Sequence, residues 1–567
     1  FGKGSALKKA SPSLSSVTPL LDNAAERTRP KIISLGQDKK MIVFIANREG
    51  DDDKNFVLKY SVYNGSEWSK PESVAEDGTI DSTPTLLKAG NKVIIAWSDA
   101  SRTFTEKDST IDRLTAMGIS AAVYDIASGK MGREFTLTDD NYMNLSPQLN
   151  IDGTKIYCSY MKRDVAGAKE EELLDMKKIY STMAYRSYDY VSGEKKEERF
   201  VSVKHKTVTD PLLMDYNSVI TEVGGDSYLV STYTVDEDTD FNTNEDRELF
   251  LSIYNLTKGR EYYPIQISND SISQSNPKLT DINGTVYLTW LESGYLFNLT
   301  DVSSLLEAFF EEGTKSDSDI AVDKSCYING FIDGEKENRE WYSKTAKELG
   351  MDSEAYENSV YQDIASGNFG QESVNFSQNE DITSNISSYI LTTDGDDMYI
   401  FFTDFGTDED STGLEIYGMK YKRMLKEKAE DSSEGDEEWG FSGKAVQITQ
   451  ENKVIDELDL YMAEDGTVSA VSNYFSQWID ESGSIQYGSN QLVEMEFGLK
   501  NSLEVQDDDI ILPLWLAGGQ TENLSFVVEN NGLMDAKGFD YKVSCIKGST
   551  ETEIESGHKD IVLESGG

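Results

Sequence analysis

The feature that most constrains the fold is a hairpin pattern that recurs along the chain. Residues 275–290 hold a short apolar run, a turn at Asn283-Gly284, and a second run that ends at Trp290. Asn-Gly adopts the positive φ that a tight hairpin turn needs, and alternating apolar residues place one face of a strand in a core. Related hairpins occupy residues 82–97 and 146–160. Repetition of one such unit indicates a repeat architecture.

Aligning the repeats predicts seven units of four antiparallel strands. First strands are expected near Lys31, Thr83, Pro147, Ser218, Pro277, Ser387 and Glu457, and second strands near Met41, Val93, Ile156, Tyr228, Val286, Met398 and Val468. Third strands end in an aromatic residue and a polar turn, and fourth strands are short. We therefore expect an all-β fold, a seven-bladed β-propeller over residues 29–499. The alternative is two stacked β-sandwiches, which are not expected to repeat one strand order seven times.

The connections between second and third strands exceed the usual hairpin length of about 2 to 5 residues. They cover residues 48–55, 100–117, 163–180, 236–246 and 404–412. In a propeller these connections share one face, which we interpret as the working face because functional loops are usually mounted on a rigid scaffold. Residues 166–180 place acids first and lysines last, which favours a short helix.

Two stretches depart from the repeat. The fifth unit carries a small helical insertion at about residues 302–371, with helical patterns at 302–310 and 340–364. Residues 1–28 lack sustained periodicity and are expected to form a linker or an added edge strand.

Charge and composition exclude several partners. The chain has 102 acidic against 53 basic residues, a net charge of -49, so its surface repels phosphate backbones and no nucleic-acid partner is expected. It has no apolar run of about 18 residues, so no membrane span is expected. Cys158, Cys326 and Cys545 are too few for a disulfide framework or a zinc site. Two histidines leave little material for a Ser–His pair.

Residues 500–567 differ from the repeats. A strand, the turn Asn530-Asn531-Gly532, a step through Asp535-Ala536 and an aromatic strand resemble the immunoglobulin-like CARDB modules of bacterial and archaeal surface proteins. The resemblance implies an extracellular, cell-surface protein with further domains, and the start at Phe1 agrees with a fragment or a processed product.

The repeats also loosely resemble secreted sialidase-like proteins in their Pro-containing first strands and aromatic second strands. The Ser-x-Asp-x-Gly-x-x-Trp box of that family is missing. The resemblance implies a site of three arginines, a Tyr nucleophile and a carboxylate. Arg48, Arg102 and Arg163 lie near second-strand ends in three successive units and would be the arginines, with Asp99 as a carboxylate.

Other candidate ligand contacts also lie where second strands end or on their connections. With Arg48, Asp99 and Arg163, the expected ligand-binding set includes Glu292, Asp404 and Trp478. Trp478 lies in a connection of the last unit and is the tryptophan expected to stack on a sugar ring. The other tryptophans mostly fall in strand patterns and are expected in blade cores.

Two acidic connections have oxygen ligands at the spacing of a calcium loop. Their candidate metal ligands are Asp236, Asp238, Asp240, Asp404, Asp408 and Asp410. Phe241 and Arg247 occupy positions where the helix–loop–helix calcium motif requires Gly and Glu, so that motif is absent. No cofactor is expected, and Ca²⁺ is the one ion that these loops would suit.

Together these features predict an extracellular adhesion or ligand-binding protein that takes a glycan or protein ligand without catalysis. The alternative is a divergent sialidase-like or other glycan-cleaving hydrolase. Fold alone does not decide between them.

Overall fold

The computed structural model describes the chain between residues 14 and 565. Residues left out within that span are 23, 26, 49–55, 139, 166, 170–180, 197, 202–211, 237–246, 262–264, 269–271, 295, 305, 307–373, 376–385, 387, 406–412, 426–436, 442–444, 452, 481–483, 506–509, 512–522 and 548. The chain divides into two compact units, residues 24–378 and residues 1–23 with 379–567. We describe each unit by itself.

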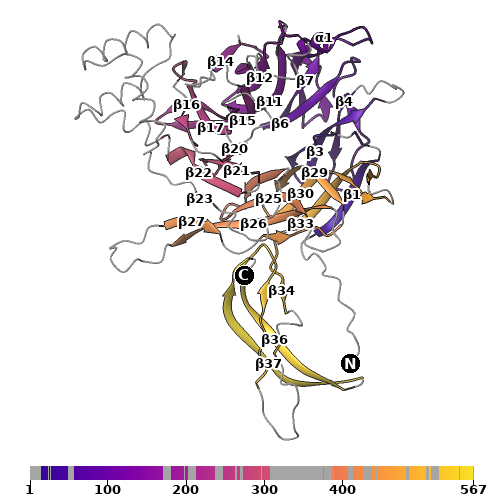
Figure 1. Cartoon of the computed structure of the whole chain (residues 1–567), viewed down its shortest axis with the longest axis vertical. Helices are drawn as coiled ribbons and strands as arrows, with labels where there is room; N and C mark the ends of the chain where they lie inside the picture. The colour runs from indigo at the N-terminus through magenta and orange to yellow at the C-terminus, as the bar shows by residue number, and fades with distance from the viewer. Residues whose placement is uncertain are drawn as a thin grey trace, which may run out of the picture. The chain divides into compact units, whose positions relative to one another are not determined.

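Five antiparallel sheets make up the described part of the first unit (Figure 1). Each is built on four strands that pair in chain order, with a further short strand in the second and fourth sheets. The first sheet holds β2 (Lys31–Gly36), β3 (Lys39–Asn47), β4 (Phe56–Tyr63) and β5 (Glu72–Ser73); the second β6 (Asp81–Ala89), β7 (Lys92–Ala100), β8 (Met117–Asp125), β9 (Lys130–Met131) and β10 (Phe135–Thr136). The third holds β11 (Met143–Asp152), β12 (Lys155–Arg163), β13 (Ser181–Asp189) and β14 (Arg199–Val201). The fourth holds β15 (Leu212–Val223), β16 (Asp226–Asp236), β17 (Arg247–Asn255), β18 (Arg260–Glu261) and β19 (Ile265–Gln266); the fifth β20 (Gln274–Ile282), β21 (Thr285–Glu292), β22 (Leu296–Asp301) and β23 (Val374–Asn375).

Second strands form the cores of these sheets. In β3, β7 and β12 almost every residue is buried, including neighbours whose side chains point to opposite faces. Apolar side chains on both faces of one strand are buried only when other parts of the fold cover both faces. Trp97 of β7 and Tyr160 of β12 are fully buried in this way.

First strands share an irregularity that the hairpin pattern does not show. In β6, β11 and β20 the pairing register shifts at a residue with positive φ that precedes a proline: Thr83, Ser146 and Asn276. Such β-bulges free a backbone N–H from the ladder. The Ser146 amide donates to Thr83 Oγ1 at 3.3 Å, and the Asn276 amide donates to Asp215 Oδ2 at 3.2 Å. The bulges at Ser146 and Asn276 are therefore each satisfied by a side chain of the preceding sheet, which ties these sheets together.

The second unit contains two sheets of the same type, joined by one parallel contact between Leu414 and Val454. One holds β24 (Tyr389–Thr393), β25 (Met398–Phe405), β26 (Leu414–Leu425), β27 (Glu437–Phe441) and β28 (Val446–Gln447). The other holds β29 (Val454–Met462), β30 (Thr467–Phe475), β33 (Gln491–Gly498) and, as its outer strand, β1 (Leu14–Asp22). The N-terminal segment thus supplies the fourth strand of this sheet.

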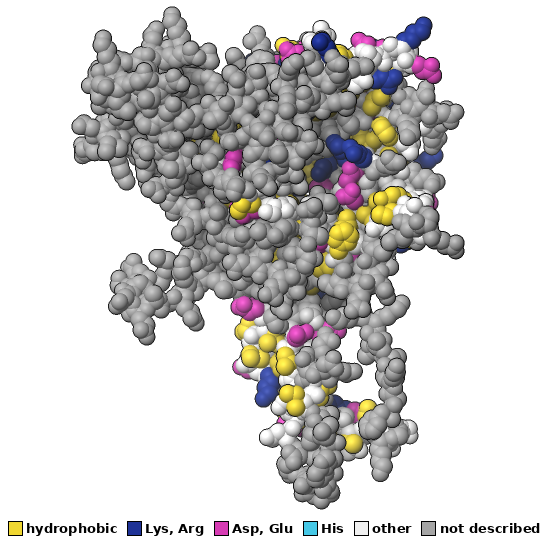
Figure 2. Space-filling model, viewed as in Figure 1, with side chains coloured by type: hydrophobic (Ala, Val, Ile, Leu, Met, Phe, Trp, Pro, Cys, Tyr) yellow, Lys and Arg dark blue, Asp and Glu magenta, His cyan; other side chains and the backbone are white. Residues whose placement is uncertain are grey.

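After β33 the chain forms smaller sheets. Strand β34 (Leu503–Glu504) pairs with β35 (Glu529–Asn530), and β36 (Ala536–Lys547) pairs with β37 (Thr550–Leu563) in a long hairpin. Hydrophobic side chains reach the surface along this hairpin (Figure 2); Ile546 and Ile554 are 73% and 67% exposed. An immunoglobulin-like module at residues 500–567 stays a prediction.

The predicted all-β fold of repeated four-stranded sheets is confirmed, since every expected second strand falls within an observed one and six of the seven first strands do. The seven-blade count stays a prediction. The helical patterns at 166–180 and 340–364 lie in or almost wholly in residues outside those described. The sequence missed α1 (Thr110–Thr115) between β7 and β8, which a capping box of Ser109 and Asp112 starts. No helix among the described residues is long and apolar enough to cross a membrane.

Candidate functional site

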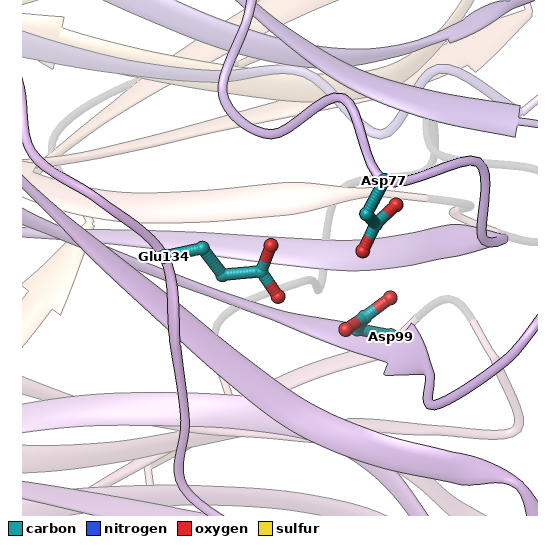
Figure 3. Close-up of side chains that lie close together, drawn as sticks. All are labelled: Asp77, Asp99 and Glu134. Carbon is teal, nitrogen blue, oxygen red and sulfur yellow. The ribbon is translucent and has the colours of Figure 1, made fainter.

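Three carboxylates converge near the junction of the first and second sheets. Asp99 lies near the end of β7, Asp77 in the connection from β5 to β6, and Glu134 just before β10. One oxygen from each lies within 4.8 Å of the others. Their side chains point toward one another, two from loops and one from a strand end (Figure 3). We call these residues the acidic cluster.

Asp99 is the buried member of the acidic cluster, with 7% of its surface exposed. Ser120 Oγ donates to Asp99 Oδ2 at 2.8 Å, and Thr79 Oγ1 lies 2.8 Å from Asp99 Oδ1. Burial raises the pKa of Asp99 to about 7; the Ser120 and Thr79 hydrogen bonds oppose this rise, and the charges of Glu134 and Asp77 add to it. Near neutral pH the Asp99 carboxyl therefore holds a proton part of the time.

Thr79 connects two members of the acidic cluster. Its hydroxyl lies 2.6 Å from Asp77 Oδ1 as well as 2.8 Å from Asp99 Oδ1. A hydroxyl donates only one hydrogen bond, so two ionised carboxylates cannot both be satisfied by it. If Asp99 carries the proton, it donates to Thr79 and Thr79 donates to Asp77. The position of the Thr79 hydroxyl between the two carboxyls and the raised pKa of Asp99 thus both indicate a proton on Asp99.

Asp81 is a second buried acid, directly opposite Asp99 in the β6–β7 ladder. Its carboxyl accepts from the Leu58 amide at 2.7 Å and from Trp97 Nε1 at 3.0 Å. Burial raises the pKa of Asp81 well above its usual value, although both hydrogen bonds oppose this rise. Because Leu58 belongs to β4, Asp81 links the second sheet to the first.

The acidic cluster suits two kinds of chemistry. Its oxygens are ligands that a hard cation such as Ca²⁺ accepts, and a proton-holding carboxyl beside others suits acid–base catalysis. Both oxygens of Asp99 already face hydroxyls, and the residue is buried. A sugar therefore reaches Asp77, which is exposed, and Glu134, which is half-buried, before it reaches Asp99.

The three predicted arginines have separate surroundings. Arg48 lies 3.5 Å from Glu76 and donates to the Thr79 carbonyl at 3.2 Å, beside the acidic cluster. Arg102 pairs with Asp108 at 2.8 Å on the β7–β8 connection. Arg163 ends β12, where burial lowers its pKa. Arg48 and Arg102 thus each have a local carboxylate partner, and a shared arginine triad stays a prediction.

A tyrosine–carboxylate pair occurs in the third sheet, where Tyr160 donates to Glu198. Tyr160 is fully buried, and burial, followed by the bond to Glu198, raises its pKa. Lys162 lies 2.7 Å from Glu198 and 2.5 Å from Asp140 and is only 3% exposed. A buried phenol with a raised pKa is a poor nucleophile, so this ion-pair network is structural.

The structure places three of the remaining predicted ligand contacts, of which Trp478 lies on a short strand and not in a loop. Glu292 ends β21, and the buried Asp404 in β25 accepts from the Phe405 amide at 2.7 Å. Trp478 lies on β31 (Gln477–Ile479) and is 48% exposed. Of the predicted calcium ligands, Asp236 lies 3.7 Å from Arg247. Asp238, Asp240, Asp408 and Asp410 lie outside the described residues.

Asp77 and Glu134 are the members of the acidic cluster that the sequence did not single out. Neither lies near a second-strand end, and Asp77 comes from the connection that precedes the second sheet. Glu134 belongs to the same sheet as Asp99, because β10 pairs with β8 and β8 pairs with β7. Asp77 lies four residues before Asp81, which pairs directly with Asp99. Asp77-Gly78-Thr79 does contain an acid two residues before a hydroxyl, a turn-forming pattern.

Comparison with known proteins finds likeness only among solved structures; no protein-family model and no curated protein matches. Similar structures are the Trypanosoma rangeli sialidase in complex with the inhibitor DANA (8% identity, TM-score 0.36, 76% of this chain and 56% of that chain) and the intramolecular trans-sialidase from Ruminococcus gnavus in complex with oseltamivir carboxylate (8%, 0.36, 85% and 97%). A third is an ulvan lyase of a new polysaccharide lyase family (11%, 0.42, 86% and 94%). This chain spans just over half of the length of the Trypanosoma enzyme. Structural similarity at these identities and TM-scores does not assign a site or an activity to this chain. A function must therefore be argued from the residues of this chain.

Proposed function

We propose that this chain is an extracellular ligand-binding protein that contacts its ligand through the connections following its second strands. The observation that carries the proposal is the β7–β8 connection. Its helix α1 buries no residue, so the connection is not held in place by core packing. A loop that is exposed and yet well defined is the kind of element that presents side chains to a partner.

Internal contacts define this connection instead. Arg102 pairs with Asp108. The guanidinium groups of Arg102 and Arg113 lie over the Phe104 ring, at 5.0 and 5.5 Å from its centroid. Hydrogen bonds to the Asp108 carboxylate lower its pKa to about 2: the largest effect comes from the Thr105 amide, followed by Arg102 and the Thr105 hydroxyl. Arginine and aromatic side chains held in one place are typical of binding hot spots.

The ligand that we propose is a glycan or a protein at the cell exterior. The net charge of -49 disfavours nucleic acid and anionic membranes. In this proposal residues 500–567 act as a spacer within a larger surface protein.

The test is binding of the labelled full chain to arrays of glycans and of extracellular proteins. We expect at least one array signal to fall about tenfold or more when Arg102, Phe104 and Arg113 are together replaced by Ala. Asp38→Asn, in the exposed β2–β3 turn, is the matched control and should leave the signal unchanged. Signals that the triple variant retains in full would contradict the proposed surface.

Glycan hydrolysis is the second candidate, and the raised pKa of Asp99 beside Asp77 and Glu134 favours it. A glycosidase needs one carboxyl kept protonated near a second one. Burial of Asp99 weighs against it, and we expect no turnover of sialyl or aryl glycosides. Hydrolysis that disappears in Asp99→Asn, Arg48→Ala or Arg163→Ala variants of unchanged fold would establish the enzyme instead.

A further inference from the structure

A short ribbon between β30 and β33 presents the exposed Trp478. Strand β31 pairs antiparallel with β32 (Ile485–Tyr487), with Trp478 opposite Gln486 and Gln477 opposite Tyr487. The Asp480 amide donates to the Ser484 carbonyl at 2.9 Å, and the Gly488 amide donates to the Ser476 carbonyl at 2.7 Å. Backbone bonds therefore close the ribbon at both ends.

One face of the ribbon combines an indole with fixed polar groups. Residues directly opposite each other in an antiparallel pair share a face, as do alternate residues of one strand. Trp478, Gln486 and Asp480 accordingly belong to the same face. Gln486 Nε2 donates to Asp480 Oδ2 at 2.8 Å, and the Ser484 amide donates to Asp480 Oδ1 at 3.0 Å. In the described part of the chain nothing donates to Gln486 Oε1, so this acceptor faces solvent beside the indole.

The opposite face of the ribbon carries one aromatic contact to β30. The Tyr487 ring meets the Phe475 ring edge-on, with centroids 5.9 Å apart and an interplanar angle of 66°. Aromatic pairs of this geometry are stabilising beyond the apolar area that they bury. Trp478 has no such ring partner among the described residues, although it is the larger side chain. Trp478 is 48% exposed and Tyr487 is 62% exposed, so the indole is accessible to a ligand although it is the less exposed of the two rings.

We propose that the face formed by Trp478, Asp480 and Gln486 binds an uncharged pyranose ring of an oligosaccharide. This inference rests on the proposed ligand-binding function and assigns it a site and a ligand class. A pyranose has a flat side of C–H groups, which packs on an indole, and a rim of hydroxyls. Those hydroxyls donate to Gln486 Oε1 and to Asp480 and accept from the second Gln486 amide hydrogen.

Charge selects a neutral ligand over an acidic one. Asp480 presents a carboxylate on this face, and the chain as a whole carries -49. A carboxylated or sulfated sugar placed on the indole would meet Asp480 at short range and would be repelled. A neutral hexose or an N-acetylated one meets no such charge.

The experiment is isothermal titration of the full chain with cellohexaose, mannohexaose, xylohexaose and chitohexaose, with trigalacturonate as the acidic probe. We expect a Kd of about 10 µM to 1 mM for at least one neutral probe and no measurable binding of trigalacturonate. Trp478→Ala should weaken that binding at least tenfold, and Gln486→Ala about threefold or more. Ile485→Ala, on the opposite face of the same ribbon and 56% exposed, is the control and should keep the wild-type Kd.

The outcomes separate this site from the proposed function. Neutral-sugar binding that Trp478→Ala leaves intact, in a variant whose circular dichroism and melting match wild type, would remove the ribbon site and leave the ligand-binding function standing. Binding of trigalacturonate in preference to neutral probes would overturn the ligand class. A third outcome is that wild type binds no hexaose, while its array binding is lost only when Arg102, Phe104 and Arg113 are replaced by Ala. That outcome would support the proposed function and refute this inference.

Discussion

At the scale of single residues, the buried Asp99 makes stability depend on pH. Its folded pKa of about 7 lies above its usual value of 3.8, so the folded state binds the proton more tightly than the unfolded state does. Stability from this group is therefore fully present below about pH 4 and is lost as pH rises toward 7. Between pH 5 and pH 8 the loss amounts to about 2 to 3 kcal/mol.

Asp99→Asn should remove this dependence, because an amide keeps hydrogen bonds to Ser120 and Thr79 without ionising. We compare the free energy of unfolding of the variant with that of wild type at each pH. We expect this difference to shift in favour of the variant by about 2 kcal/mol between pH 5 and pH 8. Urea unfolding at the two pH values measures it. Asp38→Asn, in an exposed turn where Asn also tolerates positive φ, should show no such change. If the free energy of unfolding changed with pH equally in Asp99→Asn and in wild type, the Asp99 carboxyl would not be the group that holds the proton.

Lys162 tests the neighbouring ion-pair network. Lys162→Met leaves Asp140 and Glu198 in a largely buried position without their cation, and we expect a loss of about 3 to 5 kcal/mol in unfolding free energy. The matched control is Lys196→Met. Lys196 and its partner Glu194 are both more than half exposed, so this substitution should change the free energy of unfolding by less than about 0.5 kcal/mol. Equal losses of unfolding free energy for the two substitutions would show that the buried network stabilises the fold no more than an exposed ion pair does.

At the scale of elements, Gly418 of β26 marks a close approach. A Cβ at this position would lie 2.8 Å from Leu533 Cδ2 and 3.0 Å from Phe401 Cε1. Gly418→Ala should therefore destabilise the second unit by about 1 to 3 kcal/mol and speed hydrogen exchange around Leu533. Gly167→Ala, where a Cβ meets nothing within 4 Å, serves as the control. Unchanged exchange near Leu533 would mean that the contact is easily relieved.

Elements also show how far the sequence leads. Strands and turns were predictable because alternation and Asn-Gly, Asp-Gly or Ala-Gly turns are local signals. The bulges at Ser146 and Asn276 were not, because their amides hydrogen-bond to side chains of the preceding sheet. The acidic cluster divides in the same way. Alternation predicted Asp99 near the end of β7, but Asp77 and Glu134 lie on connections that the pairing of β6 with β7 and of β10 with β8 brings to Asp99.

At the scale of the whole molecule, β1 is the element whose removal should matter most. It pairs with β33 from Leu14–Phe497 to Asp22–Gln491. Deleting residues 1–23 leaves the β33 edge unpaired, and free edges recruit other strands. We expect the truncated chain to melt at a lower temperature and to self-associate as concentration rises, measured by calorimetry and light scattering. Addition of a synthetic peptide of residues 14–22 should reverse both effects; monomeric, unchanged behaviour without it would show that β1 is dispensable.

The pairing of β1 with β33 also sets an order of events during synthesis. Residues 14–22 leave the ribosome before the strand that they pair with, which is made some 470 residues later. At about 5 to 20 residues per second this is a wait of roughly half a minute or longer. Over that interval the segment remains an apolar strand without a ladder, exposed to other nascent chains. A chaperone that holds residues 14–22 until β33 emerges should therefore raise the yield of folded protein more than one that acts after release.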